Sequence, residues 1–511
     1  MEQKIKKKGF LNMVERVGNK LPHPATIFVI LCGIIVLLSA LLANMGVSVT
    51  YTGLDRATNE IKELTVSIKS LLTSEGIRYM FESAVSNFTS FAPLGTVLVA
   101  LLGVGVAEGT GLIGTLLKKL VTSTPKRLIT VVVVFAGVIS NIASDAGYVI
   151  LIPLGAVVFL SFKRHPLAGI AAAFAGVSGG FSANIIFGPT DALLAGITTE
   201  SAKMVQAGYE VNIASNWFFL IASTVLITVV GTIITEKVVE PRLGPYKGKN
   251  QVEEINGISK EEKRGLKFAL IALILFVIVM GLLVIPEWGP LRNPETGEIL
   301  KSPFMNSMVA IISMGFFIPG IAFGIGKGDI KDDKQVVHLM SKSMSSMGGY
   351  IVLVFFAAQF VAYFGYTNIG TIIAVKGADF LQNTGIGGVP LILGFIVVSA
   401  FINLFMGSAS AKWAIMAPVF VPMFMRMHYS PELVQMAYRI GDSSTNIISP
   451  LMTYFALIVA FAEVYDEDTG IGTLISTMVP YSIAFLICWT ILLIAWFLLG
   501  LPLGPGAGLY I

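Results

Sequence analysis

The sequence predicts an all-α polytopic membrane protein with an inverted internal repeat, and two observations lead to this fold class. First, hydrophobic residues make up 55% of the 511-residue chain and charged residues only 13%, whereas soluble domains carry about 25% charged residues. Apolar runs long enough to cross a bilayer recur from Ala25 to the C-terminus. Second, the pattern Ser-x-Asn-Ile-Ile occurs at 182–186 and again at 444–448, each time with another asparagine 43 positions upstream of its own. A motif and a spacing that recur together indicate one structural unit used twice.

Charge and cysteine content exclude several other classes of protein. A formal charge of +4 is too small to indicate a nucleic-acid partner. Cys32 and Cys488 both lie within apolar runs, which is typical of small packing residues and not of a disulfide or a metal site. The first apolar run, 25–45, has 21 residues. A signal-peptide core has about 7–15, so we expect this run to be retained as a membrane span.

The first elements follow from the charges that flank the apolar runs. Residues 1–23 are basic and are expected in the cytoplasm, because lysine and arginine accumulate on that side of a membrane. A first span is predicted at 24–45 and a second at about 92–117. The polar, helix-compatible residues 46–88 between them are expected to form an external loop.

The apolar stretch 128–162 is too long for one span and too short for two. Polar residues interrupt its middle, at 140–147, and both of its ends are basic. Both ends are therefore expected in the cytoplasm, and we interpret the stretch as a re-entrant helical hairpin with a polar tip. Backbone that is not helical persists at that depth only where it is buried in protein or lines a wet cavity. The alternative, one long tilted helix, would reverse the sidedness of everything that follows.

The remaining elements complete one repeat and build a second. A broken helix, 167–200, is interrupted by glycines and Pro189, and a span at 217–236 ends the first repeat, which covers 24–240. A linker and an extra span follow at 241–303. The second repeat, 304–511, then contains two spans at 305–325 and about 336–364, and a hairpin at 386–426. A broken helix at 431–463, interrupted at 441–450, and a final span at 474–499 complete it.

The extra span reverses the direction in which the second repeat enters the membrane. The chain therefore has nine predicted transmembrane helices and two re-entrant hairpins, arranged as an inverted repeat. This is the plan of secondary transporters, whose substrate and ion sites lie where discontinuous helices meet.

Two oxygen-rich clusters coincide with the predicted hairpin tips and helix breaks. Asn141, Asp145, Ser182 and Asn184 would form the first cluster. Asn403, Ser408, Ser444 and Asn446 would form its symmetric copy. Side-chain and backbone oxygens suit a hard cation such as sodium. The alternative is that the asparagines only cap the broken helix ends.

Charges at predicted membrane depth are functional candidates, because burying them in lipid is unfavourable. They are Glu108, Asp145, Asp191, Lys412, Arg439, Asp442 and Glu463. Arg439 and Asp442 are three positions apart, hence on one helical face, and could pair with each other. A buried guanidinium could instead bind a substrate carboxylate in a bidentate manner. Trp413 could be an interfacial anchor or could stack on an aromatic substrate.

The sequence does not favour an enzyme. Gly176–Gly180 matches the nucleophile-elbow pattern, but the four histidines all flank predicted loops. The chain contains no phosphate-binding G-x-x-x-x-G-K-[ST] motif, so ATP hydrolysis is not expected and transport would use an ion gradient. An ion channel is the second hypothesis, although two inverted, non-identical clusters favour a carrier over a symmetric pore.

Four strings in this order resemble the AbgT family of p-aminobenzoyl-glutamate transporters. They are 140–148 (SNIASDAGY), 179–184 (GGFSAN), 408–418 (SASAKWAIMAP) and 438–450 (YRIGDSSTNIISP). The resemblance covers nearly the whole chain. It implies nine transmembrane helices with two re-entrant hairpins, a homodimer, and a fold akin to sodium-coupled dicarboxylate carriers.

The resemblance also implies a substrate, a location and a set of site residues. The substrate would be p-aminobenzoyl-glutamate or a related aromatic antimetabolite of the sulfonamide type, and the membrane the bacterial inner membrane. The substrate-binding positions would be Asp191, Asn403, Ser408, Trp413, Arg439, Asp442 and Pro450. No cofactor is implied beyond sodium or a proton as the coupling ion. A sodium-coupled dicarboxylate-type carrier is the alternative activity.

Overall fold

The protein is represented by a computed structural model that is mostly helical. It describes residues 24–55, 60–143, 147–246, 248, 257–299, 302–345, 347–450, 452, 454–467 and 469–511. Predictions that fall on the other residues, among them the cytoplasmic N-terminus 1–23 and Asp145, lie outside the described part of the chain.

The described residues of the first half form two strands and eleven helices. They are α2 (Pro24–Asn44), β1 (Ser48–Asp55), β2 (Glu60–Ser67), α3 (Ser74–Glu82), α4 (Ala84–Thr89), α5 (Ala92–Gly109), α6 (Leu112–Thr122), α7 (Ile129–Ser140), α8 (Ile152–Ser161), α9 (Pro166–Phe174), α10 (Pro189–Ala202), α11 (Trp217–Ile234) and α12 (Glu240–Leu243). Single turns of 3-10 or π-helix lie at Lys126–Leu128, Asn141–Ala143, Gly147–Leu151, Ala175–Gly179 and Thr235–Val239.

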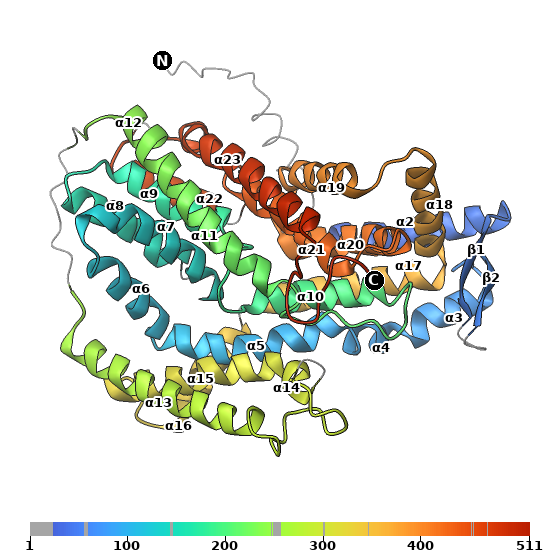
Figure 1. The fold of residues 1–511 in the computed structure, drawn as a ribbon, viewed down its shortest axis with the longest axis horizontal. Coiled ribbons are helices and arrows are strands. Elements are labelled where there is room, and N and C mark those ends of the chain that lie inside the picture. Colours follow the sequence, from blue (N-terminus) through green and yellow to red (C-terminus); the bar gives the residue numbers. More distant parts are fainter. Residues whose placement is uncertain are drawn as a thin grey trace.

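In the described residues of the second half, the regular elements are all helices. Its helices are α13 (Lys260–Val284), α14 (Pro303–Asn306), α15 (Met308–Lys327), α16 (Asp333–Ser345), α17 (Gly348–Tyr366), α18 (Ile369–Asn383), α19 (Gly388–Asn403), α20 (Ala409–Arg426), α21 (Pro431–Asn446), α22 (Phe455–Glu463) and α23 (Ile471–Leu498). On one side of the molecule α15 and α16 lie along α5, and α13 lies along α15 (Figure 1).

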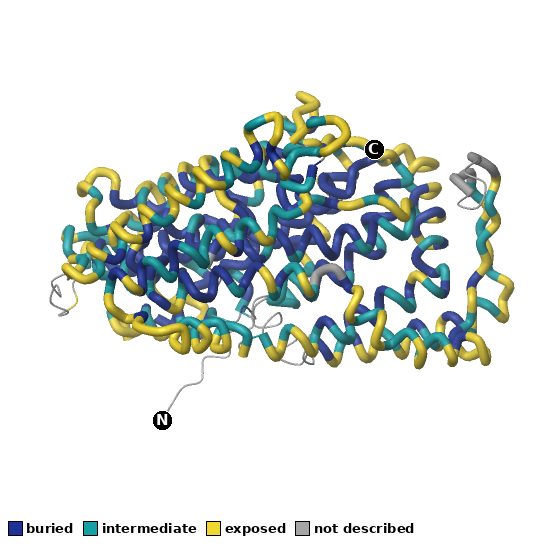
Figure 2. Tube along the Cα trace, turned by 90° about the horizontal axis from the view of Figure 1, so that it is seen from below, coloured by how far each residue is buried: buried dark blue, intermediate teal, exposed yellow. Residues whose placement is uncertain are grey.

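Within the described residues, six helices are long and apolar enough to cross a membrane, or seven if α5 and α6 are counted as one bent span. The six are α2, α11 with its continuation through α12, α13, α15, α17 and α23. These helices carry the predicted spans at 24–45, 217–236 and 474–499. Many of their leucine, isoleucine and valine side chains are exposed, as in Leu275 and Val277 of α13. Figure 2 shows the buried residues gathered in the interior and the exposed ones outside. Apolar side chains on the outside of a helical bundle are typical of contact with lipid.

Three predicted elements differ from the structure. The segment 46–88 is not purely helix-compatible: β1 and β2 pair in an antiparallel hairpin with Ser48 opposite Ser67, so the all-α prediction was wrong here. Alternating β-branched and polar residues explain this hairpin.

The predicted second span bends by 59° between α5 and α6, where Gly111 adopts a φ of +84° that other residues rarely adopt. A predicted span at about 336–364 is divided into a surface helix, α16, and the apolar α17.

The chain reverses between α7 and α8, the two helices of the first predicted hairpin. Gly137 of α7 faces Gly176, and Asn141 bonds to Gly180, so α7 runs parallel to α9 and the π-turn that continues it. In α8, by contrast, Gly155 faces Gly169 and α8 runs antiparallel to α9. Glycine at these contacts lets the backbones approach closely, as at many helix interfaces in membranes.

A second reversal with the same plan lies between α19 and α20. The α19 backbone at 396–400 packs against Gly441, and its last residue bonds to Asp442, so α19 is parallel to α21. The start of α20 lies near Tyr438 and its end near Tyr429, so α20 is antiparallel to α21. Each reversal therefore precedes a helix that ends inside the protein.

Charged residues lie at the open end of the first reversal, where α7 begins and α8 ends. The Arg164 guanidinium forms an ion pair with Glu240 of α12 and donates to Thr130 Oγ1 of α7 at 2.7 Å. His165 caps α9 beside it, and burial lowers the pKa of this imidazole, although Asp466 and Glu240 act in the opposite direction. Arg164 and its partners therefore link the N-terminal ends of α7 and α9 to α12.

The glycine contacts give a stability prediction with a matched control. Gly155→Ala should destabilise the protein, because the added Cβ would lie 2.7 Å from the Gly169 carbonyl oxygen, and overpacking costs about 1–3 kcal/mol. Gly394→Ala in α19 meets no atom within 4 Å and should stabilise slightly, since alanine favours a helix over glycine by about 0.5–1 kcal/mol. Thermal unfolding of both variants in detergent measures the difference, and equal melting temperatures would contradict the helix contact.

Candidate functional site

Buried charges meet where α10 begins and α19, α20 and α21 come together. Asp191 lies in the first turn of α10, Lys412 in α20, and Arg439 and Asp442 in α21. Each of these side chains is at most 2% exposed. Because a buried charge is stable only when it is paired and hydrogen-bonded, the partners of these four groups define the site.

Arg439 pairs with Asp191 across the two broken helices. Its Nη2 lies 2.5 Å from Asp191 Oδ1. The second carboxylate oxygen, Oδ2, accepts from the backbone N–H of Gly188 at 2.8 Å and so caps α10, which has Pro189 in its first turn. Arg439 Nε has no partner among the described residues. The guanidinium therefore keeps a buried donor that its carboxylate partner does not use.

The predicted pair between Arg439 and Asp442 does not form. Asp442 instead forms an ion pair with Lys412, whose Nζ also donates to Asn403 Oδ1. The two residues share one helical turn, but each reaches a different neighbouring element: Arg439 faces α10, and Asp442 faces α20. Helical spacing identified the shared turn but could not identify these partners.

Trp413 is completely buried and is not at a surface, so it is not an interfacial anchor. Its Nε1 donates to Thr198 Oγ1 at 2.9 Å, and its ring stacks on Tyr438 with centroids 4.5 Å apart. Gln435 Nε2 also donates to Thr198 Oγ1, and Gln435 Oε1 accepts from Asn216 Nδ2. Sequence reasoning missed Thr198 and Gln435, although Gln435 lies one turn before Arg439 on the same helix.

Two further predicted substrate residues lie at helix ends. Ser408 caps α20: its Oγ accepts from the Ala411 backbone N–H at 3.3 Å and lies 3.2 Å from Ser410 Oγ. Pro450 lies in the irregular segment between α21 and α22 and is half-buried. The predicted break at 441–450 starts later than expected, because α21 continues to Asn446.

The first oxygen cluster contains three buried atoms with no partner among the described residues: Asn141 Oδ1, Ser182 Oγ and Asn184 Oδ1. Ser182 and Asn184 lie in irregular backbone between α9 and α10. Leaving a buried polar atom unbonded costs about 1–3 kcal/mol. Uncharged oxygens of this kind fit a hard cation, so these residues could hold one.

The side-chain oxygens of the second cluster are all hydrogen-bonded. Asn403 Nδ2 lies within hydrogen-bond distance of Asn446 Oδ1, at 2.9 Å, and Ser444 Oγ donates to the Ile440 carbonyl at 2.5 Å. Ser444 and Asn446 belong to the last turn of α21, where a serine can bond to the carbonyl one turn back. The two clusters thus share a sequence pattern but differ in how their oxygens are used.

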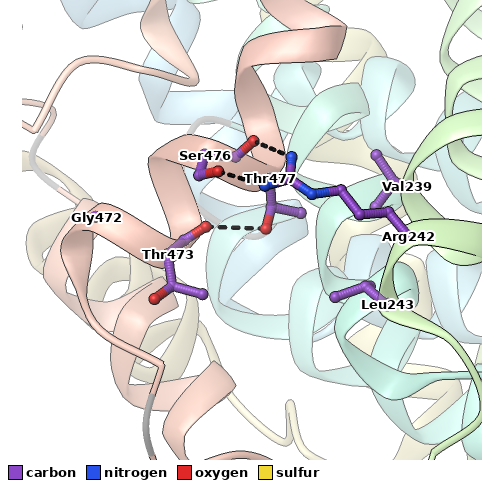
Figure 3. Close-up of a pocket in the computed structure, with 7 residues that line it drawn as sticks. All are labelled: Val239, Arg242, Leu243, Gly472, Thr473, Ser476 and Thr477. Carbon is purple, nitrogen blue, oxygen red and sulfur yellow. Dashed lines mark hydrogen bonds between the residues drawn. The ribbon is translucent and has the colours of Figure 1, made fainter.

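A surface cavity of about 350 Å³ lies apart from these groups (Figure 3). It is lined by Val239, Arg242, Leu243, Gly472, Thr473, Ser476 and Thr477. Arg242 Nη2 donates to Ser476 Oγ at 2.8 Å there. None of the predicted site residues lines this cavity.

Many apolar helices, two chain reversals and paired charges buried at helix breaks define a multi-pass membrane transport protein. The sequence model of the AbgT putative transporter family matches residues 9–511, and the chain therefore belongs to this family. It is 40% identical to the p-aminobenzoyl-glutamate transport protein of Escherichia coli K12 over 493 residues, which cover 96% of this chain and 95% of that protein.

Two solved structures are also similar. The YdaH transporter of Alcanivorax borkumensis, described as having an unusual topology, superposes with a TM-score of 0.89 at 46% identity, covering 95% of this chain and 100% of that one. MtrF of Neisseria gonorrhoeae, described as illuminating a class of antimetabolite efflux pumps, gives a TM-score of 0.92 at 50% identity over 98% of this chain and 100% of that one. The chain is accordingly a transporter and not an enzyme, as the sequence predicted.

The buried ion pair gives a second prediction. Replacing Asp191 or Arg439 alone by alanine should cost about 3–5 kcal/mol, since it leaves a buried charge without its partner. Replacing both should cost less than the sum of the two single changes. A double-mutant cycle on unfolding free energy measures this coupling.

The partly exposed pair Lys203–Glu200, with N–O distance 3.0 Å, is the control for that cycle. Exposed pairs contribute about 0–1 kcal/mol. Equal coupling in the two cycles would show that Asp191 and Arg439 do not depend on each other.

Proposed function

We propose that this chain is an ion-gradient-driven secondary transporter of p-aminobenzoyl-glutamate or related aromatic antimetabolites of the sulfonamide type, working by alternating access. The observation that carries the proposal is the buried Arg439, which is paired with Asp191 at a helix break and retains an unpartnered Nε. Two relatives support the substrate class: a p-aminobenzoyl-glutamate transport protein and a member of a class of antimetabolite efflux pumps.

The proposed substrate site is built around Arg439. A guanidinium binds a carboxylate through two parallel donors, and Arg439 has Nε available beside the Nη2 that Asp191 engages. A substrate carboxylate would share or displace Asp191. Trp413 would contact the aromatic ring with the part of its surface that Tyr438 does not cover. Asn403, Ser408, Asp442 and Pro450 complete the proposed site.

The proposed architecture has nine transmembrane helices and two re-entrant hairpins, 128–162 and 386–426, in two inverted repeats, 24–240 and 304–511, separated by the linker and extra span 241–303. The matching chain reversals support this arrangement, since Asn141–Gly180 and Asn403–Asp442 are both 39 positions apart. We further propose a homodimer in the bacterial inner membrane with the N-terminus, 1–23, in the cytoplasm. The basic residues of that segment support this orientation.

The coupling ion is proposed to be sodium or a proton. For sodium, the proposed ligands in the first cluster are Asn141, Asp145, Ser182 and Asn184. Three of these supply unpartnered buried oxygens. Binding there would order the irregular backbone before α10, which carries Asp191. The ion would thus fix the position of Asp191, the residue that pairs with Arg439.

Alternating access is supported by how completely the charges are enclosed. Arg439, Asp191 and Trp413 are at most 2% exposed, so a substrate could reach them only after helices move apart. A carrier that opens to one side at a time needs a closed form of this kind.

Gradients imposed on proteoliposomes test the coupling. Flux of p-aminobenzoyl-glutamate and of a sulfonamide should rise at least several-fold with either a sodium or a proton gradient, and the effective gradient identifies the ion. Preloaded unlabelled substrate should also drive counterflow. Flux without counterflow would indicate a pore and overturn the carrier mechanism.

Substitution of Arg439 tests the substrate site. Hydrogen bonds to charged groups are worth about 1.5–3 kcal/mol, so Arg439→Ala should lower substrate flux by about 10- to 100-fold. Arg439→Lys should recover only part of it, because an ammonium lacks the planar fork. Arg242→Ala, at the separate surface cavity, is the matched control and should keep flux within about twofold. Undiminished flux in folded Arg439→Ala protein would eliminate this site.

A further inference from the structure

The two asparagine clusters have the same hydrogen-bonded frame. Asn141 Nδ2 donates to the Gly180 carbonyl at 3.3 Å, and Asn403 Nδ2 donates to the Asp442 carbonyl at 2.6 Å; both pairs are 39 positions apart. Each amide is therefore held in the same way against the broken helix that follows it. Corresponding atoms in the two clusters can be compared one by one.

The corresponding oxygens differ in every case. Asn141 Oδ1, Ser182 Oγ and Asn184 Oδ1 have no partner among the described residues. Their counterparts are all bonded: Asn403 Oδ1 accepts from Lys412, Ser444 Oγ donates to a carbonyl, and Asn446 Oδ1 lies 2.9 Å from Asn403 Nδ2. The first cluster offers three oxygens to a ligand, whereas the second offers none of these.

Lys412 accounts for the largest difference. Its Nζ contacts both Asn403 Oδ1 and Asp442 Oδ1, and its side chain is fully buried. Lys412 follows Asn403 by nine positions, and the residue nine positions after Asn141 is Ile150. Likewise Gly180 stands in the first cluster where Asp442 stands in the second. The first cluster thus lacks both members of this ion pair.

We propose that the Lys412 ammonium is a built-in cation, which occupies in the second cluster the position that a small mobile cation takes in the first. Each chain would then bind one coupling cation at this pair of clusters and not two. The proposal rests on the proposed function only in taking the first cluster as a cation site.

The chemistry of the two cations supports this exchange. A lysine ammonium is a compact point charge with three donors, so it can contact several oxygens as a small cation does. Unlike a mobile ion, it is tethered to α20 and cannot leave during a transport cycle. It would hold the start of α20 to α19 and α21 permanently. The first cluster would be the only one of the two whose order depends on ion concentration.

Equilibrium binding of radioactive sodium to the purified full-length protein tests this inference. The wild-type chain should bind one sodium ion, and Asn184→Ala should bind none. Lys412→Met should bind one more ion than wild type, because Asp442 and Asn403 lose their cationic partner. Lys412→Met/Asp442→Asn should lose this added ion, since the carboxylate that attracts it is gone.

Lys376→Met is the matched control, because Lys376 lies in α18 and is exposed. It should bind as wild type does. If Lys412→Met is unstable, Lys412→Ala purified with methylammonium gives a second measurement. Methylammonium and sodium should each raise its melting temperature by several degrees more than that of wild type, since either can fill the position of the missing ammonium.

The outcomes separate the two proposals. If wild type binds no sodium but folded Lys412→Met gains one ion, the first cluster is not a sodium site and the Lys412 inference stands. If wild type binds one ion and folded Lys412→Met gains none, the Lys412 inference is wrong and the first cluster remains. Two ions bound to wild type at the two clusters would also overturn it.

Discussion

The pairing of charges buried at the helix breaks is the constraint on which the rest of this structure depends. Asp191 of α10 faces the buried Arg439 guanidinium, and Asp442 and Asn403 face the buried Lys412 side chain. Breaking such a pair costs far more than an exposed pair contributes. The two pairs therefore stabilise the enclosed arrangement of α10, α19, α20 and α21 that this structure shows.

The positions of the long apolar helices and of the two chain reversals could be predicted from sequence, because they depend on hydropathy and on the polar residues that interrupt it. Apolar runs locate α2, α11, α13 and α23, and polar interruptions locate both chain reversals. The structure differs from the predicted elements where the local conformational preferences of a few residues determine the secondary structure. The β1–β2 hairpin depends on strand pairing within a polar loop, and α16 separates from α17 because its residues are too polar to be buried.

The site was only partly predictable, since helical spacing shows which residues share a face but not what that face meets. Arg439 and Asp442 were correctly placed on one turn, yet each pairs with a different element. Thr198 lies in α10, far from Trp413 in sequence, and only the packing of α10 against α20 brings them within 2.9 Å. Long-range partners of this kind cannot be obtained from one sequence by periodicity.

The difference between the two clusters follows from where a helix ends. In the second copy α21 continues through Ser444 and Asn446, so its hydroxyls bond to carbonyls within the helix and its asparagine bonds to Asn403. In the first copy regular helix stops before Ser182, and the same residue types are left with unpartnered oxygens. The helix in the second copy is held by its own hydrogen bonds, whereas the unbonded oxygens of the first copy are the reason why we propose an ion there. The repeated sequence pattern therefore gives one cluster with unpartnered oxygens and one with bonded oxygens. In our proposal the first cluster responds to an ion gradient, and the second supplies a fixed frame for the charges beside it.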